Sequence, residues 1–498
     1  MRPSNARRDG FLAVGLRILP WMRLLFFTWP SILRRYSDVV TELTHDGHDV
    51  VIACPAQKHG KLPKELRGLP GVRIVAYDEV SDPMSGRAIE LLRNTRDYIW
   101  YMSPEQRIAS FNRRQALDRL VQGVTAGDRR ADPAWPDPIV ALGSDERASL
   151  DGALVELELR IPPDGGIVDF IRTHRPDAVL VSPLVKQQFH QAEVVKAARS
   201  LGIPTGFLVY SWDNLSNKGR IHVPPDRTFV WNELQRREAV ELHGLDPRSI
   251  AVTGAPHWDA FFGMAPSVGR DEFCRSHGFE AGFPIVLYLG STGRICPDEP
   301  RVVEGWLNAV RNAPGLLRET NILIRRHPDE ARQWLEWRAG HERVSLSRHP
   351  RRQDQTLYDE LHHAAAAVGL NTSAQIEASI LAKPVLTFAA GELAPGQQGT
   401  LHFYYLLKEH GGVVTFAETL GDHVAQLGRA VAGDYDRDAI RRFCETFVRP
   451  RGVDRPVAPI LVEHVIDLVA SGGRKKRPLG WLRANDRTRP GTTLEAAQ

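Results

Sequence analysis

Four consecutive residues in the second half of the chain combine the features of a phosphate-binding turn. A strand of small residues is expected to end near Leu370, and a polar turn follows it and opens a short helix. The first N–H groups of a helix have no partner within the helix, so they attract an anion such as phosphate. The residues predicted to form this turn are Asn371, Thr372, Ser373 and Ala374.

Glu377 lies one turn beyond Ser373 on the same face of that predicted helix. A carboxylate at this position can accept hydrogen bonds from the two hydroxyl groups of a ribose whose phosphate is bound at the turn. Thr372 and Gln375 have the spacing of a capping box, which is also common in ordinary helices. The residues themselves therefore leave two interpretations open, a nucleotide site and a capped helix with a surface glutamate.

Two other turns in the same half also follow strand-like segments. The first contains Gly290, Ser291 and Thr292, and the second contains Arg326 and His327. Ligands of open α/β sheets bind outside the carboxyl ends of the strands, so all three turns are expected to meet. Small residues let a diphosphate approach the backbone, and arginine and histidine add charge and directional donors. We predict a diphosphate site here, with a solvated strand end as the alternative for Arg326 and His327.

In the first half, the segment YSWDNLSNKGR follows an apolar strand and is crowded with hydrogen-bonding groups. Asp213 is its best candidate for a general base that takes a proton from an acceptor hydroxyl. The alternative is an aspartate that only forms a turn beside its neighbour. Asp259, Glu193 and His190 are weaker acid or base candidates. The predicted substrate contacts in this segment are Trp212, Asn214 and Lys218.

Two more segments carry predicted substrate contacts. Trp29 and Ser31 follow the first strand and are expected to face a cleft between domains, although Ser31 could equally cap the next helix. Gln398 belongs to the segment GQQGTLHF, whose amides suit a sugar or base pocket. His362 and His363 are assigned to a helix surface, and we predict no metal site.

These turns require strands and helices that alternate along the chain, and the sequence shows this pattern twice. RLLFFT, DVVIAC and VRIVAY are separated by helical or turn segments, and the same rhythm resumes at PIVLYL. Such alternation predicts two doubly wound parallel sheets. The predicted domains are an N-terminal extension over residues 1–22, a first domain over 23–270, a second over 280–470 and a basic disordered tail over 471–498.

Composition limits the other classes of function. The 498 residues exceed one typical core, and 64 basic against 60 acidic residues give a net charge of +4, which argues against a general nucleic-acid binder. The four cysteines show no paired spacing, so neither a zinc site nor a disulfide framework is indicated. Arg17, Pro20 and Arg23 interrupt the apolar N-terminal stretch, which disfavours a signal peptide and leaves a membrane-surface anchor as an alternative.

The motifs VTGAPHWDAF, RRHPDE and GLNTSAQIEASILAKPVLTF resemble those of the bacterial non-hydrolysing UDP-N-acetylglucosamine 2-epimerases and glycosyltransferases of GT-B architecture, over roughly residues 170 to 420. The resemblance implies phosphate contacts at Ser373 and Ala374 and a ribose contact at Glu377. The His-Pro pair is also similar to that of capsule sialyltransferases and CDP-glycerol glycerophosphotransferases, which implies a donor phosphate on His327. An epimerase is expected to have Ser-Gly-Gly at 371–373 and His-Arg-x-Glu at 291–294, so epimerisation is disfavoured.

The resemblance implies an α/β GT-B enzyme with two Rossmann-like domains, the donor in the second and the acceptor against the first. We predict a metal-independent, cytoplasmic glycosyltransferase of bacterial surface-polysaccharide synthesis, with Asp213 and His327 as catalytic groups and no tightly bound cofactor. The donor is expected to be a UDP-sugar, with CDP- and CMP-sugars as alternatives, and the acceptor a saccharide or a lipid-linked glycan, with peripheral contact at the inner face of the membrane as an alternative location. A 2-epimerase or hydrolase, a glycerophosphotransferase and a catalytically silent scaffold remain open.

Overall fold

The computed structural model describes residues 21–56, 63, 66–78, 83–106, 110–125, 137–185, 190–347 and 354–472. The predicted extension over residues 1–22 lies outside this part of the chain except for its last two residues. The predicted tail lies outside it from residue 473 onward.

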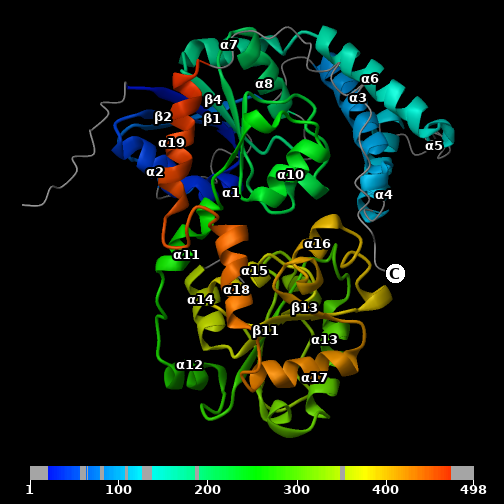
Figure 1. The fold of residues 1–498 in the computed structure, drawn as a ribbon, viewed down its shortest axis with the longest axis vertical. Coiled ribbons are helices and arrows are strands. Elements are labelled where there is room, and N and C mark those ends of the chain that lie inside the picture. Colours follow the sequence, from blue (N-terminus) through cyan, green and yellow to red (C-terminus); the bar gives the residue numbers. More distant parts are fainter. Residues whose placement is uncertain are drawn as a thin grey trace, which may run out of the picture.

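Seven parallel strands form the first sheet, in the order β3-β2-β1-β4-β5-β6-β7 (Figure 1). Leu24 to Phe27 in the first strand are all buried, as expected for a parallel strand covered by helices on both faces. The strand order reverses direction between β1 and β4, which places a crevice at the carboxyl ends of these strands. The strands are β1 (Arg23–Thr28), β2 (Asp49–Pro55), β3 (Val72–Tyr77), β4 (Ala178–Ser182), β5 (Thr205–Leu208), β6 (Arg227–Val230) and β7 (Ile250–Val252).

The second sheet repeats this topology with six parallel strands, in the order β10-β9-β8-β11-β12-β13. Its central strand is a continuous apolar run in which all five residues are buried. Its own reversal of strand order lies between β8 and β11. The strands are β8 (Ile285–Leu289), β9 (Asn321–Arg325), β10 (Val344–Leu346), β11 (Ala366–Gly369), β12 (Val385–Phe388) and β13 (Val414–Ala417).

Helices cover both sheets, and the first sheet carries most of the long ones (Figure 1). Those of the first half are α1 (Pro30–Leu33), α2 (Ser37–His45), α3 (Pro83–Tyr101), α4 (Ser110–Thr125), α5 (Asp137–Ala141), α6 (Ser144–Arg160), α7 (Gly165–His174), α8 (His190–Ser200), α9 (Asn214–Asn217), α10 (Glu233–Glu241) and α11 (Asp259–Gly263). Those of the second half are α12 (Arg270–His277), α13 (Glu299–Arg311), α14 (Asp354–His363), α15 (Ala374–Ile380), α16 (Leu401–Tyr405), α17 (Leu420–Val431), α18 (Arg437–Phe443) and α19 (Val457–Ala470).

The strand pattern read from the sequence agrees with the structure except at the edges of the second sheet. β10 and β13 were not predicted; all three residues of β10 and two of the four residues of β13 are only half-buried. An edge strand has one paired neighbour and needs less apolar sequence than a central one.

The last helix of the described chain returns to the first sheet, although the sequence places residues 457–470 in the second domain. Leu461, Val465 and Leu468 of α19 belong to the same apolar core as Leu24 and Leu180 of the first sheet. Figure 1 shows α19, in red, beside the strands of the first sheet in the upper half of the molecule, whereas α18 lies in the lower half. An amphipathic helix packs wherever a complementary apolar face is left uncovered, and sequence order does not specify which face that is.

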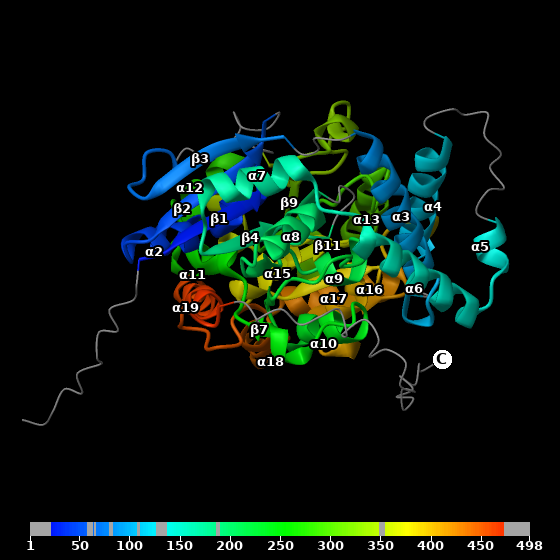
Figure 2. The ribbon, with the colours of Figure 1, turned by 90° about the horizontal axis from the view of Figure 1, so that it is seen from above.

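An arm of helices α3, α4, α5 and α6 is inserted between β3 and β4 and flanks the first sheet on one side. Both Figure 1 and Figure 2 place these helices together, with α5 at the outer end. The arm has an apolar cluster of its own that includes Tyr98, Trp100 and Leu120. It therefore forms a separate layer beside the sheet.

Candidate functional site

A cleft of about 700 Å³ lies between the two domains at the carboxyl ends of the strands. Both of its walls contain residues that the sequence singled out. The residues that line it are Trp29, Pro30, Ser31, Arg34, Arg35 and His257 on the first wall, and Leu289, Gly290, Arg325, Arg326, His327, Pro328, Leu357, Thr372, Ser373, Ala374 and Glu377 on the second.

The end of β9 supplies the positive charge of the second wall. Arg325 is already compensated, because its Nη1 lies 2.7 Å from Oε2 of the buried carboxylate of Glu360. Arg326 donates from Nη2 to the carbonyl oxygen of Ser347 at 3.4 Å, and no ion pair involves it in the described residues. Arg326 therefore brings a positive charge to the cleft, whereas Arg325 mainly joins β9 to α14.

His327 has a defined orientation at the same strand end. Its Nδ1 accepts a hydrogen bond from the N–H of Asp329 at 3.2 Å. In the neutral ring the proton then resides on Nε2, because one nitrogen accepts and the other carries hydrogen. His327 is thus set up as a hydrogen-bond donor in a cleft-lining position.

The polar turn before α15 lies on the same wall. Gln375 makes one half of the predicted capping box, since its Oε1 accepts from the N–H of Thr372 at 3.2 Å. Its Nε2 donates to the carbonyl oxygen of Gly369 at 3.0 Å, which ties the turn to the end of β11. Ser373 is the N-cap residue and Ala374 the first residue of the helix, and both line the cleft, as does Glu377 one turn later.

Asn371 was predicted to join this turn as a phosphate contact, but its side chain faces inward. It is 6% exposed, and its Nδ2 donates to the carbonyl oxygen of Gln397 at 3.0 Å. It therefore fastens the turn to the loop after β12. Gln398, the next residue of that loop, is partly exposed and is not among the residues that line the cleft.

The turn after β8 reaches the cleft through Gly290 alone. Ser291 is 1% exposed, and Glu299 accepts from its N–H at 2.9 Å and from its hydroxyl at 2.8 Å. Burial raises the pKa of Glu299 to about 7. A second carboxylate, that of Glu330, accepts from the N–H of Gly293 at 2.9 Å. The N–H and hydroxyl groups of Ser291, which we predicted to bind phosphate, thus donate to the carboxylate of Glu299. Thr292 is not among the residues that line the cleft.

Gly290 is needed where the turns after β8 and β9 touch. A Cβ atom at this position would lie 2.8 Å from the backbone nitrogen of His327 and 2.9 Å from the carbonyl oxygen of Arg325. Both neighbours are backbone atoms, so they cannot move aside by a change of rotamer. The absence of a side chain therefore brings His327 close to the end of the central strand.

On the first wall, Arg35 and His257 form a polar pair that links segments far apart in sequence. Nη1 of Arg35 donates to the carbonyl oxygen of Tyr210 at 3.2 Å and lies 3.2 Å from Nε2 of His257. Burial, with a further contribution from Arg35, lowers the pKa of His257 well below its usual value, so the ring is neutral. Its Nε2 accepts from the arginine, which leaves the proton on Nδ1. The rest of this wall consists of Trp29, Pro30, Ser31 and Arg34.

Sequence reasoning gave no role to Arg35 or His257. The available signal was that His257 closely follows β7, just as the other candidates follow their strands. Arg35 lies in η1 (Arg34–Tyr36), directly after α1, and nothing in its local sequence distinguishes it from a solvated arginine.

Asp213 and its neighbours lie outside the residues that line the cleft. Oδ2 of Asp213 lies 2.8 Å from Nζ of Lys218. Burial by itself would raise the pKa of Asp213, but Lys218 and His402 outweigh it and hold the pKa well below the usual range. A carboxylate with so little affinity for protons is a weak general base. The predicted base and the predicted substrate contact Lys218 thus form an ion pair with each other.

The other two predicted contacts of this segment are also used within the protein. Trp212 is 6% exposed and packs edge-on against His402 of α16 at 4.6 Å between ring centroids. Oδ1 of Asn214 accepts from the backbone N–H groups of Tyr210 at 3.0 Å and Ser211 at 3.2 Å. Both residues therefore shape the segment and its contact with the second domain.

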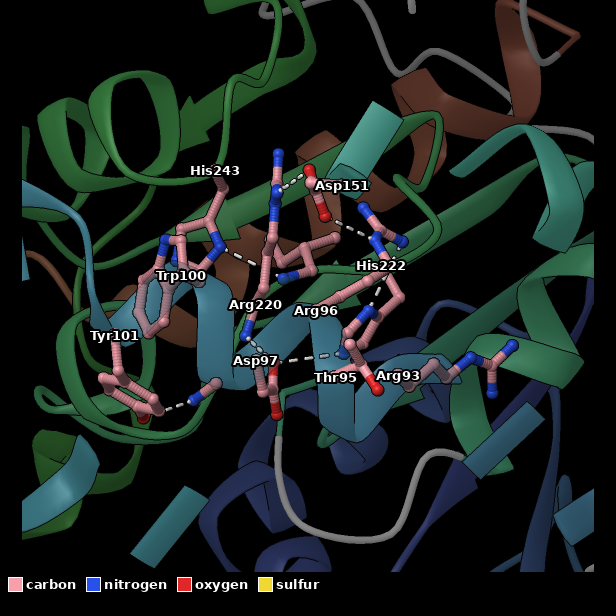
Figure 3. Close-up of polar contacts among 12 residues, drawn as sticks. Arg93, Thr95, Arg96, Asp97, Trp100, Tyr101, Asp151, Arg220, His222 and His243 are labelled. Atoms are coloured by element: carbon pink, nitrogen blue, oxygen red, sulfur yellow. Dashed lines mark hydrogen bonds and ion pairs between the residues drawn. The ribbon is translucent and has the colours of Figure 1, made fainter. Parts of the chain in front are cut away.

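Helix α3 holds the end of this segment through buried polar groups (Figure 3). Oδ1 of Asp97 accepts from the N–H of Arg220 at 2.9 Å and lies 3.2 Å from Nε2 of His222. The hydroxyl of Tyr101 accepts from the N–H of Gly219 at 2.9 Å and donates to the carbonyl oxygen of Asn217 at 2.9 Å. The arm thereby fixes the backbone around Lys218.

Of the weaker acid or base candidates, Glu193 and Asp259 are both bound in ion pairs. Glu193 contacts the buried guanidinium of Arg93 in α3 at 2.5 Å. Asp259 pairs with Arg449 at 2.6 Å and also caps the start of α19. Neither residue lines the cleft.

The described residues contain neither a cluster of metal-binding side chains nor a membrane-spanning helix. No group of three or more histidine, cysteine, aspartate or glutamate side chains is arranged to hold a metal ion within the described ranges. In the same part of the chain, no helix combines the length and apolar character needed to span a bilayer.

Solved structures of similar overall form were found, although no protein-family model and no curated protein matches this chain. A putative UDP-N-acetylglucosamine 2-epimerase from Listeria monocytogenes has a TM-score of 0.50 and 13% identity, covering 91% of this chain and 96% of that one. A glycosyltransferase from Rickettsia africae has a TM-score of 0.49 and 10% identity, with 92% and 100% covered. A UDP-GlcNAc 2-epimerase from Neisseria meningitidis, bound to UDP-GlcNAc, has a TM-score of 0.47 and 13% identity, with 89% and 99% covered.

The likeness to the Listeria structure, together with two parallel sheets that face each other across a cleft, defines the fold as GT-B. The α/β fold class and the architecture predicted from the motifs are thus confirmed. At 13% identity the likeness establishes the fold alone. Function has to be inferred from the residues of the cleft.

Proposed function

We propose that this protein is a glycosyltransferase that moves a sugar from a nucleotide-activated donor to an acceptor. The observation that carries the proposal is the convergence of Arg326, His327, Ser373 and Glu377 on one wall of a single cleft. These residues come from the ends of two different strands of one parallel sheet, the place where such sheets bind ligands.

Each group has a defined role in this proposal. Arg326 supplies positive charge, Nε2 of His327 donates a hydrogen bond, and the turn at Ser373 and Ala374 presents backbone N–H groups to the diphosphate. The carboxylate of Glu377 accepts from the ribose hydroxyls. Departure of the sugar leaves negative charge on the diphosphate, so groups fixed in place beforehand favour the transition state. Asp213 has no proton-transfer role in this scheme because of its ion pair with Lys218.

The donor and the cellular setting follow from the sequence resemblance. We propose a UDP-sugar as donor, with CDP- and CMP-sugars as alternatives, and a saccharide or lipid-linked glycan of bacterial surface-polysaccharide synthesis as acceptor. The reaction then takes place in the cytoplasm, with the inner face of the membrane as the place where a lipid-linked acceptor is met.

The second candidate is a nucleotide-sugar 2-epimerase or hydrolase, since the Listeria structure has the same fold. The turn after β8 disfavours this second candidate, because the N–H and hydroxyl groups of Ser291 already donate to Glu299 within the protein. The two activities differ in one measurable property. An epimerase or hydrolase consumes the nucleotide-sugar without an acceptor, whereas a transferase requires one.

The decisive experiment is calorimetric titration of UDP, CDP, CMP, GDP and dTDP into the wild type and the variants Glu377→Ala and Arg326→Gln. Selective binding of one nucleotide, weakened about tenfold in both variants, is expected for loss of a charge-assisted contact. Glu392→Ala removes an exposed carboxylate outside the cleft and should bind like the wild type. Failure of folded protein to bind any of the five nucleotides would refute the donor site and favour a non-catalytic scaffold.

A further inference from the structure

The first wall of the cleft carries two arginines that are not neutralised by any carboxylate of the described residues. Arg34 is exposed, Arg35 is half-buried, and neither makes an ion pair with any described residue. Arg35 contacts the carbonyl oxygen and the aromatic ring of Tyr210 and the neutral ring of His257. These contacts orient the guanidinium without cancelling its charge.

The opposite wall does not supply the missing negative charge. Among the described residues that line the cleft, Glu377 is the one carboxylate, and the proposed function uses it for the ribose. Arg326 on that wall makes no ion pair with a described residue either, while Arg325 is paired with Glu360. The cleft therefore has two centres of excess positive charge, one on each domain. Positive charge held in a partly desolvated cleft favours the binding of anions.

We propose that Arg34 and Arg35 bind a phosphate or carboxylate group of the acceptor, so that the acceptor is an anionic saccharide or glycan. This inference rests on the proposed function, because it takes the donor diphosphate to be bound at Arg326 and His327. Guanidinium groups suit the role, since they bind both anions through paired N–H donors.

The geometry of Arg35 supports a site that belongs to the first domain. Its two partners, Tyr210 and His257, both come from loops of the first sheet, so Arg35 stays with that sheet if the domains move. Arg34 is its neighbour at the end of α1. The two arginines are thus placed to hold a second anion beside the donor rather than the donor itself.

The test is titration of inorganic phosphate, glucuronate and glucose into protein saturated with UDP. Phosphate or glucuronate should bind, and glucose should not. Which of the two anions binds distinguishes a phosphorylated acceptor from a carboxylated one. Arg34→Gln should weaken binding of the anion about tenfold, the loss expected for one charge-assisted contact. UDP affinity should stay within about twofold in this variant, because Arg34 is assigned to the other wall. Arg114→Gln, which removes an exposed arginine of α4, should change neither.

Two results would overturn the inference. One is that UDP-saturated protein binds neither anion, and the other is that Arg34→Gln weakens UDP itself, which would assign the first wall to the donor diphosphate. The same titrations without nucleotide separate the two proposals. If UDP does not bind but an anion binds in a manner that depends on Arg34, the anion site stands and the donor site fails.

Discussion

The carboxylate of Asp259 lies 2.6 Å from the guanidinium of Arg449, and both side chains are more than nine-tenths buried. The other carboxylate oxygen of Asp259 accepts from the N–H of Val457 at 2.6 Å and of Ala458 at 2.9 Å. One aspartate at the end of the first domain thus holds both the segment that leaves the second domain and the start of α19.

Replacing this carboxylate should loosen the connection between the domains. We expect Asp259→Ala to lower the free energy of unfolding by about 3 kcal/mol, because it removes the carboxylate that neutralises the buried guanidinium of Arg449 and leaves that guanidinium with neutral partners such as the carbonyl oxygen of Val453. Urea denaturation followed by circular dichroism measures this. Asp454→Ala, which removes an exposed aspartate of the same connection, should change stability by less than about 0.5 kcal/mol. Equal effects of the two substitutions would contradict the role of Asp259.

Glu299 should make stability depend on pH. Burial raises its pKa from 4.5 to about 7 in the folded protein, so between these values the folded state holds a proton that the unfolded state has released. Stability is therefore expected to fall as the pH rises through this window, by at most about 3 kcal/mol for a shift of this size.

The comparison of wild type with Glu299→Gln isolates this contribution from other titrating groups. Glutamine keeps an acceptor for Ser291 but does not titrate. The difference in unfolding free energy between the two proteins should change across the window given by 4.5 and about 7 and stay constant outside it. A difference that does not vary with pH would show that Glu299 has an ordinary pKa.

Gly290 should be intolerant of any side chain. In Gly290→Ala the new Cβ would press on backbone atoms of Arg325 and His327 at less than 3.0 Å. Moving the two turns apart should lower the free energy of unfolding by about 1–3 kcal/mol. It should also weaken the binding of UDP, because His327 moves with its turn. Calorimetry and thermal unfolding measure the two effects. Gly305→Ala lies in α13 with no atom within 4 Å of the new Cβ, so it should be neutral or slightly stabilising.

Tyr101 should contribute to stability through its hydroxyl group. Tyr101→Phe removes the acceptor for the N–H of Gly219 and the donor to Asn217 in a buried place. We expect a loss of about 1–3 kcal/mol, the usual cost of a buried polar group left without its partner. Hydrogen exchange should show faster exchange at residues 217–222 while β1 and β4 are unchanged. The control is Tyr435→Phe, because the hydroxyl of Tyr435 makes no hydrogen bond with the described residues. An equal loss of stability in this control would contradict the role assigned to the Tyr101 hydroxyl.

Much of the architecture could be read from local sequence. Apolar runs such as Ile285–Leu289 predict buried parallel strands, and polar or small residues directly after them predict turns at one edge of a sheet. Both inferences need only neighbouring residues and the rules of strand and helix alternation. For this reason Trp29, Gly290, Arg326, His327 and Glu377 could be expected to meet, and the structure brings them to one cleft.

The use of each side chain was decided by partners that are remote in sequence. Ser291 looks like a phosphate ligand until Glu299 is seen to take its donors, and Asp213 looks like a base until Lys218 is seen beside it. Arg35 and His257 are 222 residues apart in the sequence. Helix α19 packs on the first sheet, although it follows the strands of the second. The sequence by itself determined all the strands except β10 and β13, the turns after them and the fold class, because these depend on local periodicity. Only the tertiary structure decided which charges are neutralised and which face the cleft, because electrostatic and hydrogen-bonding partners are set by distance in space.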